Sequence, residues 1–363
     1  MYRLLTANDS SQTRPDVISL TDIEPIGEWI RELGIPVRGL EMDEERPNPL
    51  DVLRLASWLR QSRPDVVHTW MYHANLVGGI AAKLARVPAI IWHIHHTTLD
   101  PERDKARTIK IARWSGRISG IVPHRVVSCS ESGCAVHVDL GYRANKMLFI
   151  PNGFDLTEFH PTDEVRVPVR RELGVPDDAR LVAMAARFNP QKDHHNFVEA
   201  AAWLHRRRPD IHFVLCGNGV TWENAELAGW IRDAGLESRF HLLGRRDDMS
   251  RLYAAFDVVT LSSSHGEAFP LVIGEAMASG VPCVVTDIGD SALIVGDTGI
   301  VVPPRDPKAL GAAWMELIDL TPEERAERGR RARQRIEEEF SVEAVARRFV
   351  ELYREVLDRR RTR

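Results

Sequence analysis

The sequence predicts an α/β protein built from two halves, each a doubly wound parallel sheet with helices on both faces. Short apolar runs alternate with amphipathic stretches along almost the whole chain, which is typical of parallel strands joined by crossover helices. The alternation is interrupted by a segment rich in proline and charge, near residues 152–176, and then resumes. The length of 363 residues also suits about two domains.

In the first half, which we assign to residues 1–155, the apolar runs predict strands and the stretches between them predict helices. The expected strands are residues 15–20, a run that starts at 35–37, and residues 64–69, 89–94, 125–128 and 146–150. The expected helices are residues 26–33, 50–61, 74–85 and 131–141.

The beginning of the chain departs from this pattern, because residues 1–7 lie too close to the strand at 15–20 for a crossover helix. Such a connection needs about a dozen residues. Either residues 1–7 are the end of a first helix, with the first strand and its glycine-rich loop missing, or they form a strand with an unusual connection. We favour the helix, although the first strand of such a sheet is usually central.

The second half, assigned to residues 156–340, begins with a bridge at 159–178 and then repeats the alternation. Its expected strands are residues 181–185, 212–216, 241–243, 257–261 and 282–286. Helices are expected at residues 196–208, 225–234 and 249–256, between Pro270 and Gly280, and from there to the end of the chain. Residues 341–363 form a last helix with a basic tail.

The composition limits the class of protein. A net charge of −4 with 44% hydrophobic and 28% charged residues is typical of a soluble globular protein and provides no basic domain for nucleic acid. No apolar run is long enough to span a bilayer, and we find no signal peptide. The cysteines lack the paired spacing of a zinc site, so we expect free, mostly buried thiols in a reducing cytoplasm. They are Cys129, Cys134, Cys216 and Cys283.

The stretch at residues 262–280 holds the most informative pattern. A polar loop with Glu267 leads into a short helix with Glu275, directly after a buried strand. The amides at the start of such a helix attract anions. Two carboxylates beside an anion site suit a ligand with both hydroxyls and phosphates, such as a nucleotide sugar. The alternative is a pair of solvated glutamates.

Five segments together resemble the retaining glycosyltransferases of family four, the glycosyl transferases group 1. The segments are residues 150–155, 186–193, 213–217, 262–280 and 298–303. The resemblance is strong from about Val126 to Pro304 and weaker but continuous from Ser19. It implies the GT-B fold, in which two Rossmann-like domains face each other across a cleft and the C-terminal helix crosses back to the first domain.

The resemblance implies a catalytic pair of cations, Arg187 and Lys192, after the first strand of the second half. Two fixed cations at this place can hold a diphosphate and stabilise the charge that develops as it departs. The alternative is a solvated pair on a loop. The sequence contains no Asp-x-Asp, the pair with which metal-dependent glycosyltransferases hold a divalent ion. We therefore expect no metal and no other cofactor.

The two glutamates take separate roles by the same resemblance. Glu275 matches the residue that accepts hydrogen bonds from the ribose hydroxyls, and Glu267 matches the one that contacts the transferred sugar. Backbone amides around Ala268 and Phe269 are expected to approach the sugar and the phosphate. The family commonly has glycine where this chain has Ala268, which puts in doubt any positive φ at that position.

Three further positions belong to the expected donor site. Gly244 and Arg245 resemble the loop near the nucleotide base. Gly217 lies in a tight turn that is either a plain connection from strand to helix or a phosphate contact. Leu293 stands where the family often has glutamate, so we expect one commonly used contact to be absent.

In the first half, the strand at 89–94 ends in a run of histidines. The family often places a histidine here, close to the reacting sugar, and His96 is the best match, with His95 second. Such a side chain can hydrogen-bond the donor sugar or steady developing charge. His73 follows another strand end and is expected on the acceptor side. The alternative is a group of histidines at the cleft edge without a catalytic task.

Residues 104–119 form a basic amphipathic stretch. It combines five cations with four large apolar residues: Lys105, Arg107, Lys110, Arg113 and Arg117, with Ile109, Ile111, Trp114 and Ile118. For the apolar side we prefer an ordinary surface helix packed on the first half. The basic side leaves contact with a lipid-linked acceptor, or with the inner face of the membrane, open.

The expected function is metal-independent, retaining transfer of a sugar from a nucleotide diphosphate sugar to an acceptor hydroxyl, in cell-envelope polysaccharide or glycolipid synthesis. Two alternatives remain. The chain could be a nucleotide-sugar epimerase of the same fold, or a degenerate subunit that binds nucleotide sugar without catalysis. The residues quoted for the second half argue against both.

Overall fold

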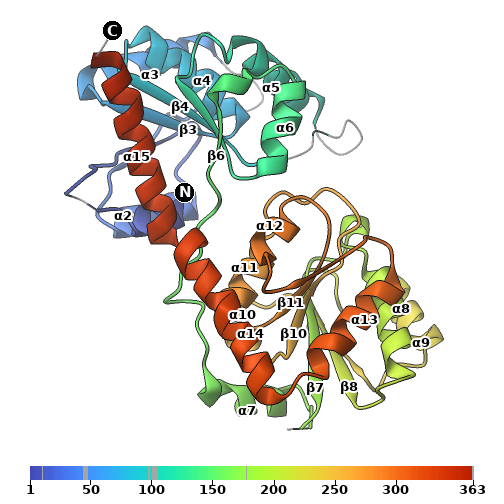
Figure 1. The fold of residues 1–363 in the computed structure, drawn as a ribbon. Coiled ribbons are helices and arrows are strands. Elements are labelled where there is room, and N and C mark those ends of the chain that lie inside the picture. Colours follow the sequence, from blue (N-terminus) through green and yellow to red (C-terminus); the bar gives the residue numbers. More distant parts are fainter. Residues whose placement is uncertain (10, 44–47, 97–98, 100–104, 177, 362–363) are drawn as a thin grey trace. The chain divides into compact units, whose positions relative to one another are not determined.

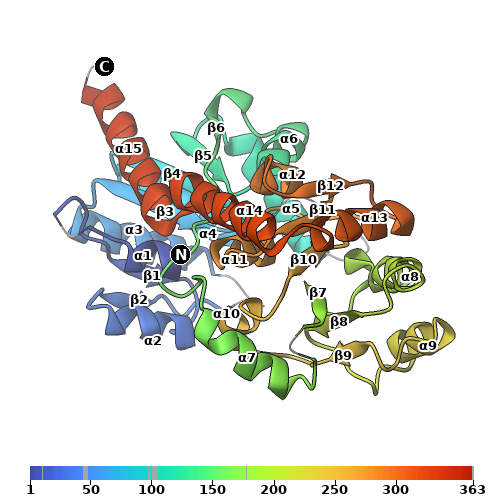
Figure 2. The same cartoon turned by 60° about the horizontal axis from the view of Figure 1, so that its bottom comes forward.

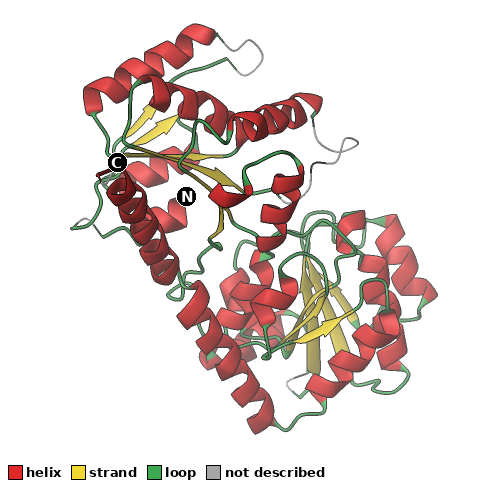
Figure 3. Ribbon diagram, turned by 45° about the horizontal axis from the view of Figure 1, so that its top comes forward, coloured by secondary structure: helices red, strands yellow, loops and turns green. Residues whose placement is uncertain are grey.

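The computed structural model describes the chain except for residues 10, 44–47, 97–98, 100–104, 177 and 362–363. The chain divides into two compact units. Unit 1 comprises Met1–Gly153 together with Val342–Arg363, and unit 2 comprises Phe154–Ser341. The sequence-based boundaries were residues 155 and 340. In each unit, parallel strands lie between layers of helices (Figure 3).

Unit 2 contains a sheet of six parallel strands in the order β12-β11-β10-β7-β8-β9 (Figure 2). The strands are β7 (Arg180–Ala185), β8 (Ile211–Cys216), β9 (Phe240–Leu242), β10 (Val258–Leu261), β11 (Cys283–Thr286) and β12 (Ile300–Val302). The chain proceeds from β7 outward to β9 and then returns to the opposite side of β7 at β10. The reversal between β7 and β10 is a topological switch point, where ligands bind outside the carboxyl ends of the strands.

Helices cover both faces of this sheet (Figure 1). One face packs on α8 (His194–His205), α9 (Ala225–Asp233) and α13 (Pro307–Ile318), in a core that includes Phe197, Phe213 and Trp314. On the other side lie α10 (Met249–Tyr253), α11 (Leu271–Ala278), α12 (Ser291–Val295), α14 (Pro322–Arg335) and the π-helical turn η3 (Ile336–Phe340). Because both faces are covered, β8 and β10 are buried along their whole length and read as continuous apolar runs.

Two parts of unit 2 differ from the expectation. The strand β12 lies in the region where only helices were expected. The segment taken as a bridge contains a helix, α7 (Asp163–Glu172), with Pro168 inside it. A proline in a helix interior removes a backbone hydrogen bond and argues against a helix, so local sequence rules miss α7.

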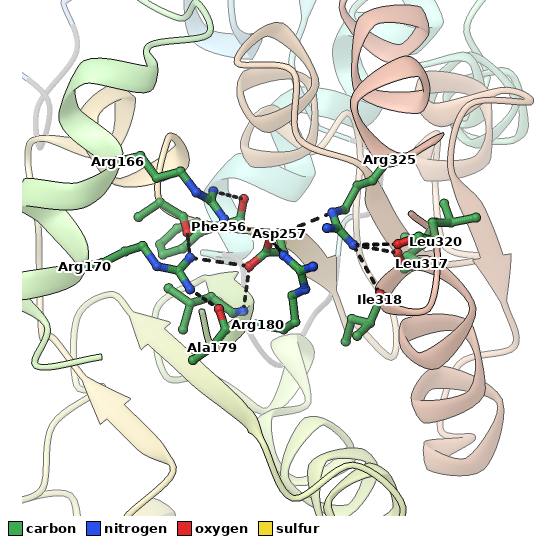
Figure 4. A network of polar contacts seen from close by, with 12 residues as sticks. Arg166, Arg170, Ala179, Arg180, Phe256, Asp257, Leu317, Ile318, Leu320 and Arg325 are labelled. Carbon is green, nitrogen blue, oxygen red and sulfur yellow. Dashed lines mark hydrogen bonds and ion pairs between the residues drawn. The ribbon is translucent and has the colours of Figure 1, made fainter. Parts of the chain in front are cut away.

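Tertiary contacts hold α7 in place. Asp257, which precedes β10 and is 3% exposed, lies among four arginines (Figure 4). Its carboxylate is 2.9 Å from the guanidinium of Arg166 and 3.5 Å from that of Arg170, both on α7. Arg180 lies 3.5 Å away and Arg325 3.8 Å away. One buried carboxylate therefore joins α7, β7, β10 and α14 at the amino end of the sheet.

Unit 1 contains a four-stranded parallel sheet and a separate pair of strands. The four strands are β3 (Val66–Trp70), β4 (Ala89–Ile94), β5 (Arg125–Ser128) and β6 (Met147–Phe149), in that order, and the pair is β1 (Val17–Ser19) with β2 (Val37–Gly39). Ile18 and Leu20 contribute to the same apolar cluster as Val67 of β3. The described residues provide no strand that pairs with both β1 and β3, and the sheet of unit 1 is therefore divided.

The helices of unit 1 are α1 (Tyr2–Thr6), α2 (Pro25–Glu32), α3 (Pro49–Ser62), α4 (Tyr72–Leu84), α5 (Ala106–Ile118), α6 (Glu131–Asp139), a 3-10 turn η1 (Ala144–Lys146) and α15 (Val342–Arg361). The residues at the beginning of the chain form a helix, which is the alternative we favoured. The last helix returns to this unit, as expected: Val345, Phe349 and Leu352 pack in one cluster with Ile91 and Val127. Within the described part of the chain, no helix is both long and apolar enough to cross a bilayer.

Candidate active site

Two loops meet at the switch point of unit 2. The first follows β7 and includes the 3-10 turn η2 (Pro190–Lys192), and the second connects β10 to α11. The amide of Ser264 donates to the carbonyl of Gln191 at 2.9 Å, and the Gln191 side-chain amide donates to the carbonyl of Gly266 at 2.9 Å. Gln191 thus links the two loops by hydrogen bonds and holds the neighbouring side chains of both loops in place.

The side chains brought together are Lys192 and Glu267. The ammonium of Lys192 lies 2.5 Å from a carboxylate oxygen of Glu267, and the two side chains are 18% and 7% exposed. The hydroxyl of Ser263 donates to the same oxygen. A buried carboxylate needs such partners because it has lost its water. The result is a cation held in one place near the carboxyl end of β7.

Arg187 lies on the exposed part of the loop after β7. It forms no ion pair with any residue that the structure describes. Of the two expected cations, Lys192 is therefore held by an ion pair and Arg187 is exposed. An open guanidinium can adjust to a phosphate with two parallel hydrogen bonds.

Glu275 lies in α11 and is 9% exposed. The hydroxyl of Tyr253 is 3.5 Å from its carboxylate. Burial, and then the charge of Glu275, raise the pKa of Tyr253 well above its ordinary value, so the phenol stays a proton donor. The same hydroxyl lies 3.2 Å from the carbonyl of Val272, so Glu275 and this carbonyl share one donor from α10.

Ala268 fits its position without strain. The positive φ in this loop falls on Gly266, at 71°, and Ala268 is not among the residues with positive φ. The carbonyl of Ala268 accepts a hydrogen bond from the amide of Asp290 at 3.0 Å. Phe269 is 5% exposed, and its ring centroid is 5.9 Å from that of Phe154, so its side chain belongs to the core.

Gly217 has a structural task in this arrangement. Its amide donates to the carbonyl of Gly244 at 2.7 Å, and its φ is 147°. A Cβ atom at this position would lie 2.1 Å from the carbonyl oxygen of Ala186. Gly217 therefore lets the loops after β7, β8 and β9 approach closely. Arg245 is exposed and pairs with Asp247 at 3.2 Å.

Replacing Gly217 with alanine should destabilise unit 2 by about 3 kcal/mol, because the new methyl group meets a carbonyl and φ is unfavourable for alanine. Urea unfolding followed by circular dichroism measures the change. Gly229 provides the control, since it lies in α9 with no atom within 4 Å of the added carbon. Gly229→Ala should stabilise by roughly 0.5–1 kcal/mol. Equal effects of both substitutions would contradict the close approach at Gly217.

The expected histidines of unit 1 lie near the carboxyl ends of β3 and β4. His96 is half-buried, with its ring centroid 5.6 Å from that of Tyr72. His95 stacks on Trp70 at 5.1 Å. His73 is exposed in the first turn of α4. The structure therefore places the three residues at the same edge of the sheet, where two neighbouring strands end.

Two histidines that we did not single out lie beside His95. The ring of His93 is 4.2 Å from that of His95, and His68 is 5.3 Å from His93. Burial lowers the pKa of His95 to about 4 and that of His93 well below its ordinary value, so both rings are neutral at pH 7. Side chains alternate between the two faces of a strand, so His68, His93 and His95 lie on the same face of the sheet. This two-residue alternation is the sequence signal that could have identified them.

Met71, between β3 and α4, was also missed. Its φ of 75° and ψ of 160° are values that residues other than glycine rarely adopt. Strained residues of this kind gather at binding sites, because the surrounding structure must hold them. No sequence signal marks this residue.

Three remaining expectations concern other side chains. Leu293 lies in α12, where its carbonyl accepts from Arg335 at 2.8 Å. None of the four cysteines is recorded in a disulfide bond; Cys129, Cys216 and Cys283 are buried, and Cys134 is half-buried. In the described ranges, no three His, Cys, Asp or Glu side chains gather as a metal site would require.

Solved structures identify the fold. The Anabaena protein HepE, solved in complex with UDP, superposes with a TM-score of 0.83 at 24% identity, over 98% of this chain and 96% of that one. Sucrose-phosphate synthase from Thermosynechococcus elongatus superposes with a TM-score of 0.75 at 19% identity, over 98% and 92% of the two chains. The fold is GT-B, as the sequence resemblance implied.

Family models identify the family. The model of the glycosyl transferases group 1 matches residues 166–335, and the model of Glycosyltransferase Family 4 matches residues 3–158. The chain therefore belongs to these glycosyltransferases, and the recognition made from the sequence is confirmed.

Curated relatives carry glycosyltransferase names. The UDP-Gal:alpha-D-GlcNAc-diphosphoundecaprenol alpha-1,3-galactosyltransferase of Escherichia coli is 28% identical over 274 residues, which are 74% of this chain and 70% of the relative. The D-inositol 3-phosphate glycosyltransferase of Kineococcus radiotolerans is 28% identical over 382 residues, or 97% and 85% of the two chains.

Proposed function

We propose that this glycosyltransferase moves a sugar from a nucleoside diphosphate sugar to an acceptor hydroxyl with retention of the anomeric configuration and without a metal ion. The observation that carries the proposal is the pair of Lys192 and Glu267 at the switch point between β7 and β10. Ligands of doubly wound sheets bind at this place. The pair offers a cation for the diphosphate beside a carboxylate for sugar hydroxyls.

In this proposal Lys192 and Arg187 bind the diphosphate. The bond between the anomeric carbon and the phosphate oxygen breaks, and the diphosphate takes the electron pair. The two cations stabilise this charge, as a divalent ion does in other enzymes. The acceptor oxygen bonds to the anomeric carbon from the side on which the diphosphate leaves, and the departing phosphate takes its proton. Retention follows from this geometry.

The remaining residues position the donor. Glu275 accepts hydrogen bonds from the ribose hydroxyls, and Glu267 accepts them from the sugar. The amides of Ala268 and Phe269 approach the sugar and phosphate, and Gly244 and Arg245 lie toward the base. In unit 1, His96 contacts the reacting sugar, and His95 and His73 line the acceptor side.

Uridine nucleotides are the donors to test first. The names of the Escherichia coli relative and of the Anabaena structure contain UDP-galactose and UDP. The same relative acts on a lipid-linked acceptor, as its name states. We therefore propose a lipid-linked or glycan acceptor in the synthesis of cell-envelope polysaccharide or glycolipid.

The test is a panel of UDP-, GDP- and ADP-sugars, offered to the purified chain with a lipid-diphosphate sugar acceptor and without one. We expect acceptor-dependent release of one nucleoside diphosphate, unchanged by EDTA, and a product with the donor's anomeric configuration by proton NMR. Isomerised nucleotide sugar without acceptor would show an epimerase instead. Failure to bind any of the three nucleoside diphosphates by calorimetry would show that the donor site does not function.

A further inference from the structure

The helix α5 of unit 1 packs with one side and exposes the other. Ile109 and Ala112 are buried, and Ile111 and Ile118 pack against the apolar cluster that includes Trp92 of β4. These residues follow the expectation of an ordinary surface helix. Trp114 does not, because it is 57% exposed. The largest apolar residue of the helix thus lies on its outer side.

The outer side of α5 is strongly basic. Its exposed residues include five cations: Lys105 at the N-cap, Arg107, Lys110, Arg113 and Arg117. The helix itself contains no acidic residue. The guanidinium of Arg117 lies 5.4 Å from the Trp114 ring centroid, so the tryptophan and the cations share one surface.

The end of α4 extends this surface. The ammonium of Lys83 donates to the carbonyl of Ile121 at 3.2 Å, which places the end of α4 beside the residues that follow α5. Ile121 is 70% exposed and Leu84 is 44% exposed. Like α5, α4 contains no acidic residue. We call this surface the α4–α5 face and define it by Lys83, Leu84, Arg113, Trp114, Arg117 and Ile121.

The α4–α5 face is positively charged, whereas the whole chain has a net charge of −4. A local excess of cations is therefore a property of this surface. Cations near a bilayer that contains anionic lipid are each attracted by about 1 kcal/mol. Tryptophan prefers the level of the headgroups, and apolar side chains among cations match the boundary between headgroups and acyl chains.

We propose that the α4–α5 face binds unit 1 to the surface of a bilayer rich in anionic lipid. Arg113, Arg117 and Lys83 interact with the headgroups, while Trp114, Ile121 and Leu84 enter the headgroup boundary. The proposal deepens the proposed function, since it brings the chain to a lipid-linked acceptor. Binding to vesicles tests it without any acceptor.

The experiment is flotation of the full chain with vesicles of phosphatidylcholine alone and with vesicles that contain about one third phosphatidylglycerol. We expect binding to the second kind and little to the first, with loss of binding at about 1 M salt, where charges are screened. The double substitution Arg113→Glu with Arg117→Glu should weaken binding by about thirtyfold or more. Trp114→Ala should weaken it further in either background.

The matched control is Arg232→Glu with Lys308→Glu. Both residues are exposed on helices of unit 2, and the control changes the net charge by the same amount. We expect it to leave binding unchanged. Equal binding of the two double variants, or equal binding to the two kinds of vesicle, would overturn the proposal.

Three readouts separate this proposal from its alternatives. Circular dichroism and hydrolysis of the donor sugar in the absence of lipid should be unchanged in the α5 variants, which shows that a loss of binding is local. Competition by a soluble anionic polysaccharide that is stronger than binding to vesicles would assign the face to a glycan and overturn the membrane assignment. An inactive chain that binds anionic vesicles would contradict the proposed function alone.

Discussion

Replacing Lys192 with alanine should lower kcat by about two to three orders of magnitude, the usual cost of removing a group that stabilises charge in the transition state. The ammonium is held 2.5 Å from Glu267, at the carboxyl end of β7, before any ligand arrives. Its placement therefore requires little rearrangement during the reaction. Initial rates with the preferred donor, compared at saturating acceptor, measure the effect.

Three variants show which property of Lys192 matters. Lys192→Arg keeps the charge and should recover part of the rate. Ser263→Ala removes the neighbouring donor to Glu267 but leaves the cation, so its loss should be smaller. Arg187→Ala should lower kcat less than Lys192→Ala, because Arg187 is exposed and water replaces it in part. A Lys192→Ala enzyme with normal kcat and a normal unfolding midpoint would refute the phosphate role.

Replacing Asp257 with alanine should destabilise unit 2 by about 3–5 kcal/mol, the usual cost of removing one partner from a buried ion pair. Asp257 is the shared partner of Arg166, Arg170, Arg180 and Arg325 (Figure 4). Burial, and then the charge of Arg166, already lower the pKa of Arg170. Without the carboxylate, that guanidinium, 1% exposed, keeps its positive neighbours and loses its counter-charge.

Urea unfolding of the full chain measures this effect, and two variants calibrate it. Asp257→Asn keeps the size of the side chain but loses its charge and one acceptor oxygen, so it separates these losses from the loss of volume. Asp297 pairs with Arg331 at the surface, with side chains 76% and 50% exposed. Asp297→Ala should therefore cost less than about 1 kcal/mol. Similar losses for Asp257→Ala and Asp297→Ala would show that the buried network contributes no more than a surface pair.

The Asp257 network also shows where sequence reasoning failed. Arg166 and Asp257 are 91 residues apart in the chain, and nothing near either residue indicates the partner. The segment around α7 was interpreted as a bridge because it is rich in proline and charge. In the folded chain, Arg166 and Arg170 also donate to the carbonyls of Ala254 and Ala255 at the end of α10.

The donor loops were more predictable. Glycine and proline mark their turns, and the buried strands before them are continuous apolar runs, so Lys192, Glu267 and Glu275 could be placed after strands β7 and β10. The sequence could not show that Lys192 pairs with Glu267, since the order of the strands decides which loops meet. The reversal at the switch point supplies that information.

Local chemistry thus determined the α/β class, the alternation of strands and helices, and the loops that carry the donor residues, because burial on both faces demands apolar strands. The limits of β4 and β5 follow from this rule. Tertiary structure alone decided the helix α7, the divided sheet of unit 1 and the exposure of Trp114. Each of these depends on which distant segments cover a side chain or pair with a strand, and such contacts leave no local periodicity in the sequence.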